Sequence, residues 1–329
     1  MRRKTVRLVV MLALVLLTAP HAAHAQPSTK VYRIGYLVGS ALGYDAASEA
    51  FTQRLRELGY TEGQNLVIES RYADGKFERL PALTAELVRL QVDCLVVSGI
   101  EGTRIAKQAT STIPIVMAAA SDDPVRLGLI TSFAHPGGNL TGVVDIAEQL
   151  AGKRLALLKE AFPHLTRVGH LAAKNASPGV ADRQEVEAAA RLIGVHVQPL
   201  DVHGPEGLEQ AFRAARDVRA EALIVVGHGF LFSHRERIVQ LVDTIRVPVM
   251  YTHTEFVRVG GLMSYADDGL ERSRRAATLV DKILKGAKPA ELPVERPTTF
   301  KLVINLKTAQ AMGLTIPPAL LFQADEVIK

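Results

Sequence analysis

Side chains that could bind a small molecule follow short apolar runs at matching places in the two halves of the sequence. The first half contributes small or polar residues after its runs: Ser40, Ser98, Gly99, Thr103, Ser121 and Asp122. The second half contributes an amide, an imidazole, two aromatic rings and an acid: Asn175, His228, Phe230, Tyr251 and Glu255. Hydroxyls, amides and carboxylates beside aromatic rings suit a small polar or zwitterionic ligand better than an apolar one. Ser98 and Thr103 have an alternative role, because both stand where these residue types commonly cap helices.

The sequence contains none of the catalytic patterns that would make this set an active site. It has no Gly-x-Ser-x-Gly, P-loop or Gly-x-Gly-x-x-Gly motif, and its histidines form no His-x-x-x-His motif. We therefore expect no enzyme activity, no metal and no cofactor. An exported hydrolase that uses His228 and the neighbouring acids is the alternative. The acidic pairs Asp122–Asp123 and Asp267–Asp268 are expected at helix N-termini, where they favour the helix dipole.

An internal repeat indicates which elements position the candidate residues. Residues 33–37 are similar to residues 167–171, and residues 113–117 to residues 247–250, both at an offset of 134. Two further matches, 58–59 with 193–194 and 93–97 with 221–226, lie in the same order along the chain. Four ordered matches predict that the chain contains the same structural unit twice.

The repeated segments are continuous apolar runs, and amphipathic stretches such as residues 47–58 and 180–192 separate them. This alternation is typical of a doubly wound parallel sheet that helices cover on both faces. The fold class that we predict is therefore α/β, with two similar parallel-sheet lobes. Ligands of such sheets bind beyond the carboxyl ends of the strands, so the candidate residues are expected to face one interlobe cleft. One large continuous sheet is the alternative.

The N-terminal 25 residues have the pattern of a cleaved export signal. Arg2, Arg3, Lys4 and Arg7 precede a ten-residue apolar run, and Ala23-His24-Ala25 follows it. Without this segment the chain has 35 basic and 34 acidic residues, a formal charge of +1. That charge excludes a large nucleic-acid surface. Cys94 is the only cysteine, so disulfides and lipid anchors are excluded and a soluble periplasmic protein is expected.

Several segments resemble one known family, the ABC transporter substrate-binding proteins related to tryptophan and aromatic amino-acid uptake receptors. The similar segments are residues 58–65, 80–88, 112–116, 135–142, 260–265, 302–309 and 324–328. The similarity between and around these segments runs from about residue 31 to the end of the chain. The resemblance covers nearly all of the expected mature protein.

The resemblance implies a type I periplasmic-binding fold in which three crossovers join two lobes around one ligand. The crossovers are expected near residues 141–146, 256–264 and 293–300. Lobe one would then comprise residues 26–145 with about 261–295, and lobe two residues 146–260 with about 300–329. The implied function is capture of a small amino-acid-like ligand by a monomer and its delivery to an ABC permease in the inner membrane. A ligand-sensing module for a membrane signalling partner is the alternative.

The chain departs from the family pattern after the apolar run that ends at Val226. Relatives commonly carry an Asp followed by Pro there, whereas this chain has Gly227-His228-Gly229. An Asp could pair with the ammonium group of a ligand, but a protonated His228 could not. The departure therefore favours a ligand that presents a hydrogen-bond acceptor to His228.

Overall fold

The computed structural model describes residues 30–39, 45–145, 150–174, 177–204, 206–227 and 229–329. Residues Tyr32–Lys329 form one compact unit. The predicted signal peptide, residues 1–25, lies outside the described residues. Among the helices of the described segments, none has both the length and the apolar character that crossing a bilayer requires.

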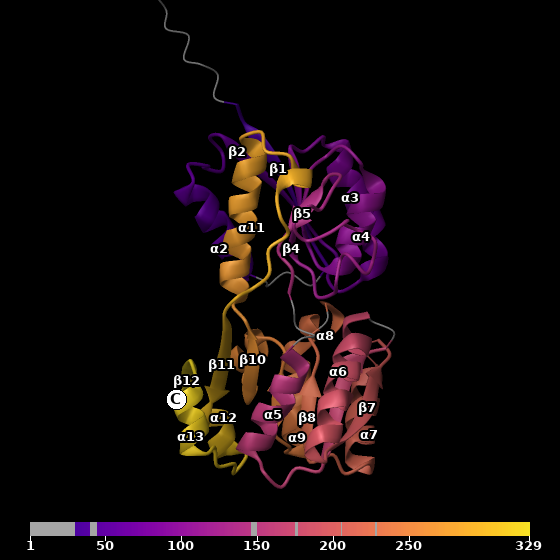
Figure 1. Cartoon of the computed structure of the whole chain (residues 1–329), viewed down its shortest axis with the longest axis vertical. Coiled ribbons are helices and arrows are strands. Elements are labelled where there is room, and N and C mark those ends of the chain that lie inside the picture. The colour runs from indigo at the N-terminus through magenta and orange to yellow at the C-terminus, as the bar shows by residue number, and fades with distance from the viewer. Residues whose placement is uncertain (1–29, 40–44, 146–149, 175–176, 205, 228) are drawn as a thin grey trace, which may run out of the picture. The chain divides into compact units, whose positions relative to one another are not determined.

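The first sheet has five parallel strands in the order β2-β1-β3-β4-β5. Figure 1 labels β1, β2, β4 and β5. Its strands are β1 (Tyr32–Val38), β2 (Leu66–Tyr72), β3 (Cys94–Ser98), β4 (Ile115–Ala119) and β5 (Leu140–Gly142). One face is covered by α3 (Leu80–Arg89), which follows the short turn η1 (Phe77–Arg79), and by α4 (Ile100–Ala109). The other face is covered by α2 (Asp45–Glu57) and α11 (Gly269–Leu284). We call this sheet and its helices lobe one.

The second sheet has seven strands in the order β12-β11-β10-β9-β8-β6-β7, and only the β10–β11 pair is antiparallel. Its strands are β6 (Arg167–Ala173), β7 (His196–Val202), β8 (Ala222–Val225), β9 (Val249–Tyr251), β10 (Met263–Asp267), β11 (Phe300–Asn305) and β12 (Glu326–Ile328). One face carries α5 (Ala151–Ala161), α6 (Ser177–Ile193) and α13 (Pro318–Gln323). The other carries α7 (Gly207–Asp217), α8 (Gly229–Ser233), α9 (Arg235–Ile245) and α10 (Thr254–Arg258). With α12 (Leu306–Ala311), which follows β11, these elements form lobe two.

The repeat in the sequence corresponds to two copies of one strand order. Strands β1 to β5 are arranged as 2-1-3-4-5, and β6 to β10 are arranged in the same way in the other sheet. The matching segments 33–37 and 167–171 lie in β1 and β6, which belong to different sheets. The predicted fold class, two parallel-sheet α/β lobes, is confirmed, and a single continuous sheet is excluded.

The two lobes exchange one helix with each other. After β5 the chain passes to lobe two, where α5 contacts α6 and β9, and after β10 it returns to lobe one, where α11 contacts α2, β3 and β4. The sequence analysis placed residues 261–295 in lobe one, with a crossover at 256–264. The structure differs here, because Met263–Asp267 pairs with both β9 and β11 and so belongs to lobe two. The second crossover therefore follows Asp267.

The two acidic pairs have different surroundings. The Asp268 carboxylate accepts hydrogen bonds from the backbone N–H groups of Leu270 (3.0 Å) and Glu271 (3.2 Å), and it caps α11 as predicted. Asp122–Asp123 was also expected at a helix N-terminus, but the residues that follow form turns. The Asp123 carboxylate accepts from the Val125 N–H at 2.8 Å, which closes the first of these turns.

Candidate functional site

The loops at the carboxyl ends of the lobe-one strands are joined by backbone hydrogen bonds. The Gly99 N–H, after β3, donates to the Ala119 carbonyl at the end of β4 (2.7 Å). The Asp145 N–H, after β5, donates to the Ala120 carbonyl (2.8 Å). Three strand ends are therefore held at one edge of the sheet, where parallel sheets bind their ligands.

In lobe two, the loops after β8 and β9 are joined through one hydroxyl. The Gly227 N–H donates to Thr252 Oγ1 (2.6 Å), and His253 Nδ1 lies 2.9 Å from the same oxygen. The imidazole of His253 covers Gly227 so closely that a Cβ there would lie 2.6 Å from its Cε1 and closer still to Nδ1. Glycine at this position therefore provides the space for the His253 ring.

An ion pair connects these two groups of loops. His253 Nε2 lies 3.5 Å from Asp145 Oδ2, and the same carboxylate oxygen lies 4.0 Å from a guanidinium nitrogen of Arg272 in the first turn of α11. Arg272 also contacts the Asp267 carboxylate. The side chains of Asp145 and Arg272 are 6% and 4% exposed. These groups lie where the first and second crossovers leave their sheets.

Burial and charge act in opposite directions on this cluster. Burial raises the pKa of Asp145, but the hydrogen bond to His253 and the charge of Arg272 lower it more, to about 2. Burial lowers the pKa of His253, but the Asp145 carboxylate raises it more, so the net shift is upward. The pKa of Asp267 is raised because its burial outweighs the charge of Arg272. Near neutral pH the Asp145 carboxylate is therefore ionised.

A second buried charge group lies behind this cluster in lobe two. Arg154 of α5 donates from Nε to the Tyr265 carbonyl (2.8 Å) and from a terminal nitrogen to Asp182 Oδ2 (3.4 Å). The other Asp182 oxygen accepts from His170 Nε2 (2.9 Å) in the middle of β6. The side chains of Arg154 and Asp182 are each 1% exposed. This group connects α5 and α6 to strands β10 and β6.

Three of the predicted site residues, Ser40, Asn175 and His228, lie outside the described residues. In lobe one, Ser98 is the last residue of β3, and Gly99 precedes α4 with φ of 96°. Thr103 is buried in the first turn of α4, where its hydroxyl donates to the Gly99 carbonyl at 2.8 Å. Gly99 itself occupies the N-cap position, so neither Ser98 nor Thr103 has the capping role that was the alternative for both.

The predicted residues after β4 form a buried acceptor. Ser121 is half-buried and Asp122 is buried, and Asp122 Oδ1 accepts from the Asp123 N–H (2.7 Å) and contacts the Arg126 guanidinium. The other oxygen, Asp122 Oδ2, is buried without a hydrogen-bond partner in the part of the chain that the structure describes. A buried carboxylate oxygen without a donor lowers the stability of the folded protein, so a hydrogen bond from a ligand to this oxygen would be favourable.

Two predicted residues of lobe two lie on short helices, Glu255 on α10 and Phe230 on α8. Glu255 lines a hollow of about 160 Å³ together with Ala46 and Ala47 of α2 and with Phe232, Arg235, Arg258 and Val259. Phe230 is half-buried on α8, and its ring lies 4.6 Å from the imidazole of His234. This hollow is formed by residues of both lobes.

Tyr251 lies in the hydrophobic core of lobe two. Its ring is fully buried and stacks on Phe256 at 4.9 Å. Burial raises the pKa of its hydroxyl, which has no hydrogen-bond partner among the described residues. Tyr251 therefore contributes chiefly to packing beneath the strand ends.

We expect Tyr251→Phe to leave the melting temperature unchanged or to raise it. The substitution removes a buried hydroxyl without a partner, whose desolvation costs about 1–3 kcal/mol, and keeps the stacked ring. Differential scanning calorimetry of both proteins measures the effect. A clear loss of stability would show that the hydroxyl has a partner after all, and a loss of ligand affinity alone would show that it contacts the ligand.

The sequence alone did not indicate Asp145, His253 or Arg272. His253 lies two residues after β9 and two before the selected Glu255, so its place in the repeat could have suggested it. Asp145 follows the strand before the first crossover. The sequence repeat includes no matching lobe-two segment for this position, so it did not indicate Asp145. Arg272 joins the site only because α11 is exchanged between the lobes, which no spacing in the sequence reveals.

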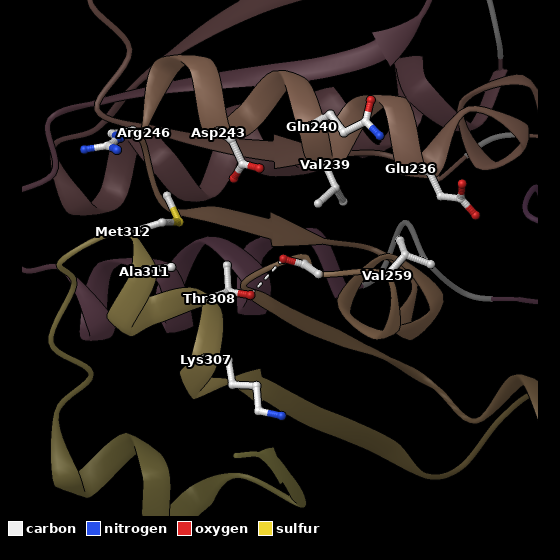
Figure 2. A pocket seen from close by; sticks show the side chains of 11 residues that line it. Glu236, Val239, Gln240, Asp243, Arg246, Val259, Lys307, Thr308, Ala311 and Met312 are labelled. Carbon is white, nitrogen blue, oxygen red and sulfur yellow. Dashed lines mark hydrogen bonds between the residues drawn. The ribbon is translucent and has the colours of Figure 1, made fainter.

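A larger hollow of about 780 Å³ lies on lobe two between α9 and α12 (Figure 2). Its charged lining residues are of both signs: Glu236, Asp243, Arg246 and Lys307. The Thr308 hydroxyl donates to the Gly260 carbonyl at 2.9 Å and closes one side of it. None of the predicted site residues lines this hollow. It lies outside the strand-end loops, so a substitution there can serve as a control.

The comparisons with known proteins agree with this architecture. The sequence profile of the family described as "ABC transporter substrate binding protein" matches residues 38–328. A structure from Streptococcus pneumoniae, solved as an ABC domain in complex with L-Trp, is 27% identical, with a TM-score of 0.83 over 91% of this chain and 100% of that chain.

Two further relatives are similar over most of their length. A conserved domain protein from Vibrio cholerae is 24% identical, with a TM-score of 0.83 over 91% of this chain and all of its own. A tyrosine-binding protein from Clostridioides difficile is 22% identical over 279 residues, which are 82% of this chain and 77% of that protein. Because the family match covers most of the sequence, the chain belongs to the ABC transporter substrate-binding proteins, a family of solute-binding proteins and not of enzymes.

Proposed function

We propose that this substrate-binding protein holds a small amino-acid-like ligand between the strand-end loops of its two lobes and delivers it to an ABC permease. The observation that carries the proposal is the contact between Asp145 and His253, because it joins the loops of β4 and β5 to those of β8 and β9. A molecule bound at this place can interact with both lobes. A ligand favours closure of two lobes only through such differential contacts.

The ligand class is supported by the chemistry at the strand ends. The free oxygen of Asp122 can accept from an ammonium group, and the loop N–H groups and hydroxyls can bind a carboxylate. The names of two relatives, one in complex with L-Trp and one described as tyrosine-binding, point to the same class. We infer ligand contacts for Ser98, Gly99, Ser121, Asp122, Phe230 and Glu255, and for Ser40, Asn175 and His228.

We further propose that the protein is exported and works as a periplasmic monomer. Residues 1–25 have the pattern of a cleaved signal, and an inner-membrane permease is the partner that an ABC substrate-binding protein requires. Fractionation of cells that produce the full chain would test export. Mature protein in the periplasmic fraction, beginning near residue 26, is the expected result.

A ligand panel tests the binding function. We expect L-tryptophan, L-tyrosine or a related amino acid to raise the melting temperature, since a ligand at 100 times its Kd stabilises the folded state by about 2.7 kcal/mol. Nucleosides and small organic acids complete the panel. Asp122→Asn is expected to weaken binding about tenfold, because one charge-assisted hydrogen bond contributes about 1.5–3 kcal/mol.

The matched control is Asp243→Asn in the hollow between α9 and α12, which should leave Kd unchanged. If no compound of the panel shifts the melting temperature, the proposed ligand class is wrong. If Asp243→Asn weakens binding and Asp122→Asn does not, the ligand binds in the α9–α12 hollow instead.

A further inference from the structure

We propose that His253 is a positioning residue for ligand binding, whose imidazole holds the strand-end loops of lobe two to the first crossover through Asp145. The inference deepens the proposed function, on which it rests. It assigns a role to a side chain that the sequence analysis did not select.

Both ring nitrogens of His253 have a hydrogen-bond partner. The Gly227 N–H donates to Thr252 Oγ1, and Nδ1 of the protonated ring, 2.9 Å away, donates to the second lone pair of the same oxygen. The protonated ring also carries a proton on Nε2, which faces the Asp145 carboxylate at 3.5 Å. Thr252 is 2% exposed, so water does not compete for its hydroxyl.

Asp145 lies where all three crossovers meet. It follows Val144, whose N–H donates to the Glu295 carbonyl on the third crossover (2.9 Å). Arg272, which faces Asp145, lies in the first turn of α11 after the second crossover and binds Asp267 before that helix. A side chain of lobe two that binds Asp145 is therefore connected to each segment that must bend when the lobes move.

The charges around the imidazole favour its protonated form. Asp145, Arg272 and Glu255 act on His253 directly, and Arg154 and Asp267 act on Asp145. Asp145 and Asp182 are buried in this region, as are Arg154, Arg272 and His170, and the Asp267 side chain is 7% exposed. A protonated His253 places a positive charge 3.5 Å from the buried Asp145 carboxylate, and this pairing offsets part of the cost of burying both charges.

The positioning contact should therefore depend on pH. The pKa of His253 is raised above its usual value, so the charged form of the contact is complete below about pH 6.5 and is lost as pH rises through the raised pKa. The pKa of Asp145 is about 2, so this carboxylate remains ionised throughout that range. Ligand affinity should follow the protonation of His253.

The experiment compares wild type with His253→Gln, His253→Ala, Asp145→Asn and the control His196→Gln, which changes an exposed histidine of β7. Melting temperature and amide hydrogen exchange of the ligand-free proteins are measured at about pH 6 and about pH 8.5, on either side of the expected transition. Calorimetry gives Kd for L-tryptophan and L-tyrosine at both pH values.

For wild type and His196→Gln we expect at least about fivefold tighter binding at the lower pH, the usual scale of such coupling. His253→Gln should abolish this pH dependence and bind at both pH values about as weakly as wild type does at the higher pH, because its neutral amide can bridge Thr252 and Asp145 but carries no charge. His253→Ala and Asp145→Asn should weaken binding about tenfold and speed exchange of the Gly227 and Asp145 amides.

A wild-type pH profile in His253→Gln, or unchanged amide exchange in His253→Ala, would overturn the inference. If wild type binds neither amino acid, the proposed ligand class fails. The inference is then decided by the ligand-free data alone, where only wild type and His196→Gln should lose stability between the two pH values.

Discussion

Replacing Arg154 with methionine is expected to lower the free energy of unfolding by about 3–5 kcal/mol, because it leaves a buried carboxylate without its cation. The Arg154 and Asp182 side chains are each 1% exposed, and Arg154 also donates to the Tyr265 carbonyl. Burial lowers the pKa of Arg154, and the charges of Asp182, Asp145 and Asp267 oppose that shift, so the guanidinium remains charged. Methionine fills a similar volume, so the loss reports on charge and hydrogen bonding more than on a cavity.

The matched control is Arg167→Met in the same lobe. Arg167 binds Glu221 at 2.7 Å, but the two side chains are 46% and 32% exposed, so this pair should contribute no more than about 1 kcal/mol. Thermal and urea unfolding of both variants measure the difference. The double variant Arg154→Met with Asp182→Asn removes both charges and keeps an acceptor for His170, so it should recover part of the lost stability. Equal losses of stability in Arg154→Met and Arg167→Met would show that the buried ion pair contributes no more than the exposed one.

The fold could be predicted from the sequence because each half repeats the same order of apolar runs. Runs such as 33–37 and 167–171 are buried from both faces of a sheet, and that burial requires continuous apolar sequence. The repeat then indicated two lobes of equal topology, which the strand order confirms. Local patterns were sufficient wherever one element is buried within its own lobe.

The same local patterns do not show which strands pair with each other when they lie far apart in the sequence. Met263–Asp267 belongs to lobe two because this strand pairs with β9 and β11, which no local pattern of the sequence shows. Asp122 and Asp268 both look like helix caps, yet only Asp268 precedes a helix. After Asp122 the chain forms a turn instead of a helix, and the Asp123 carboxylate closes this turn.

The candidate site was predicted in part for the same reason. Strand-end positions followed from the repeat, so Gly99 and Asp122 were selected correctly as residues of the strand-end loops. Their role in ligand binding stays a prediction. His253 and Asp145 lie on loops of different lobes, and only the crossovers place one beside the other. The departure at Gly227 was visible in the sequence, but its physical reason, space for the His253 ring, required the structure.

That departure leads to the second large effect, since Gly227→Ala is expected to expel the His253 ring. A Cβ at position 227 would lie 2.6 Å from Cε1 and 3.0 Å from Cγ of the imidazole, closer than nonbonded carbons approach. Gly227 does not have a positive φ, so alanine fits the backbone and the ring alone is displaced. The contacts of His253 with Thr252 and Asp145 should both be lost. We expect ligand affinity to fall about tenfold or more, the effect of one or two charge-assisted hydrogen bonds.

A double-mutant cycle separates this effect from general damage to the loop. Gly227→Ala combined with His253→Ala removes the ring that the new methyl group displaces, so the double variant should bind as well as His253→Ala alone. Gly207→Ala is the control, because its added Cβ would meet its nearest neighbour, His203, at 3.6 Å, an ordinary contact. Calorimetry and melting temperature are measured for all four variants. If the two affinity losses simply add, the methyl group does not act through the imidazole, and the lobe-two loops are then positioned by something other than His253.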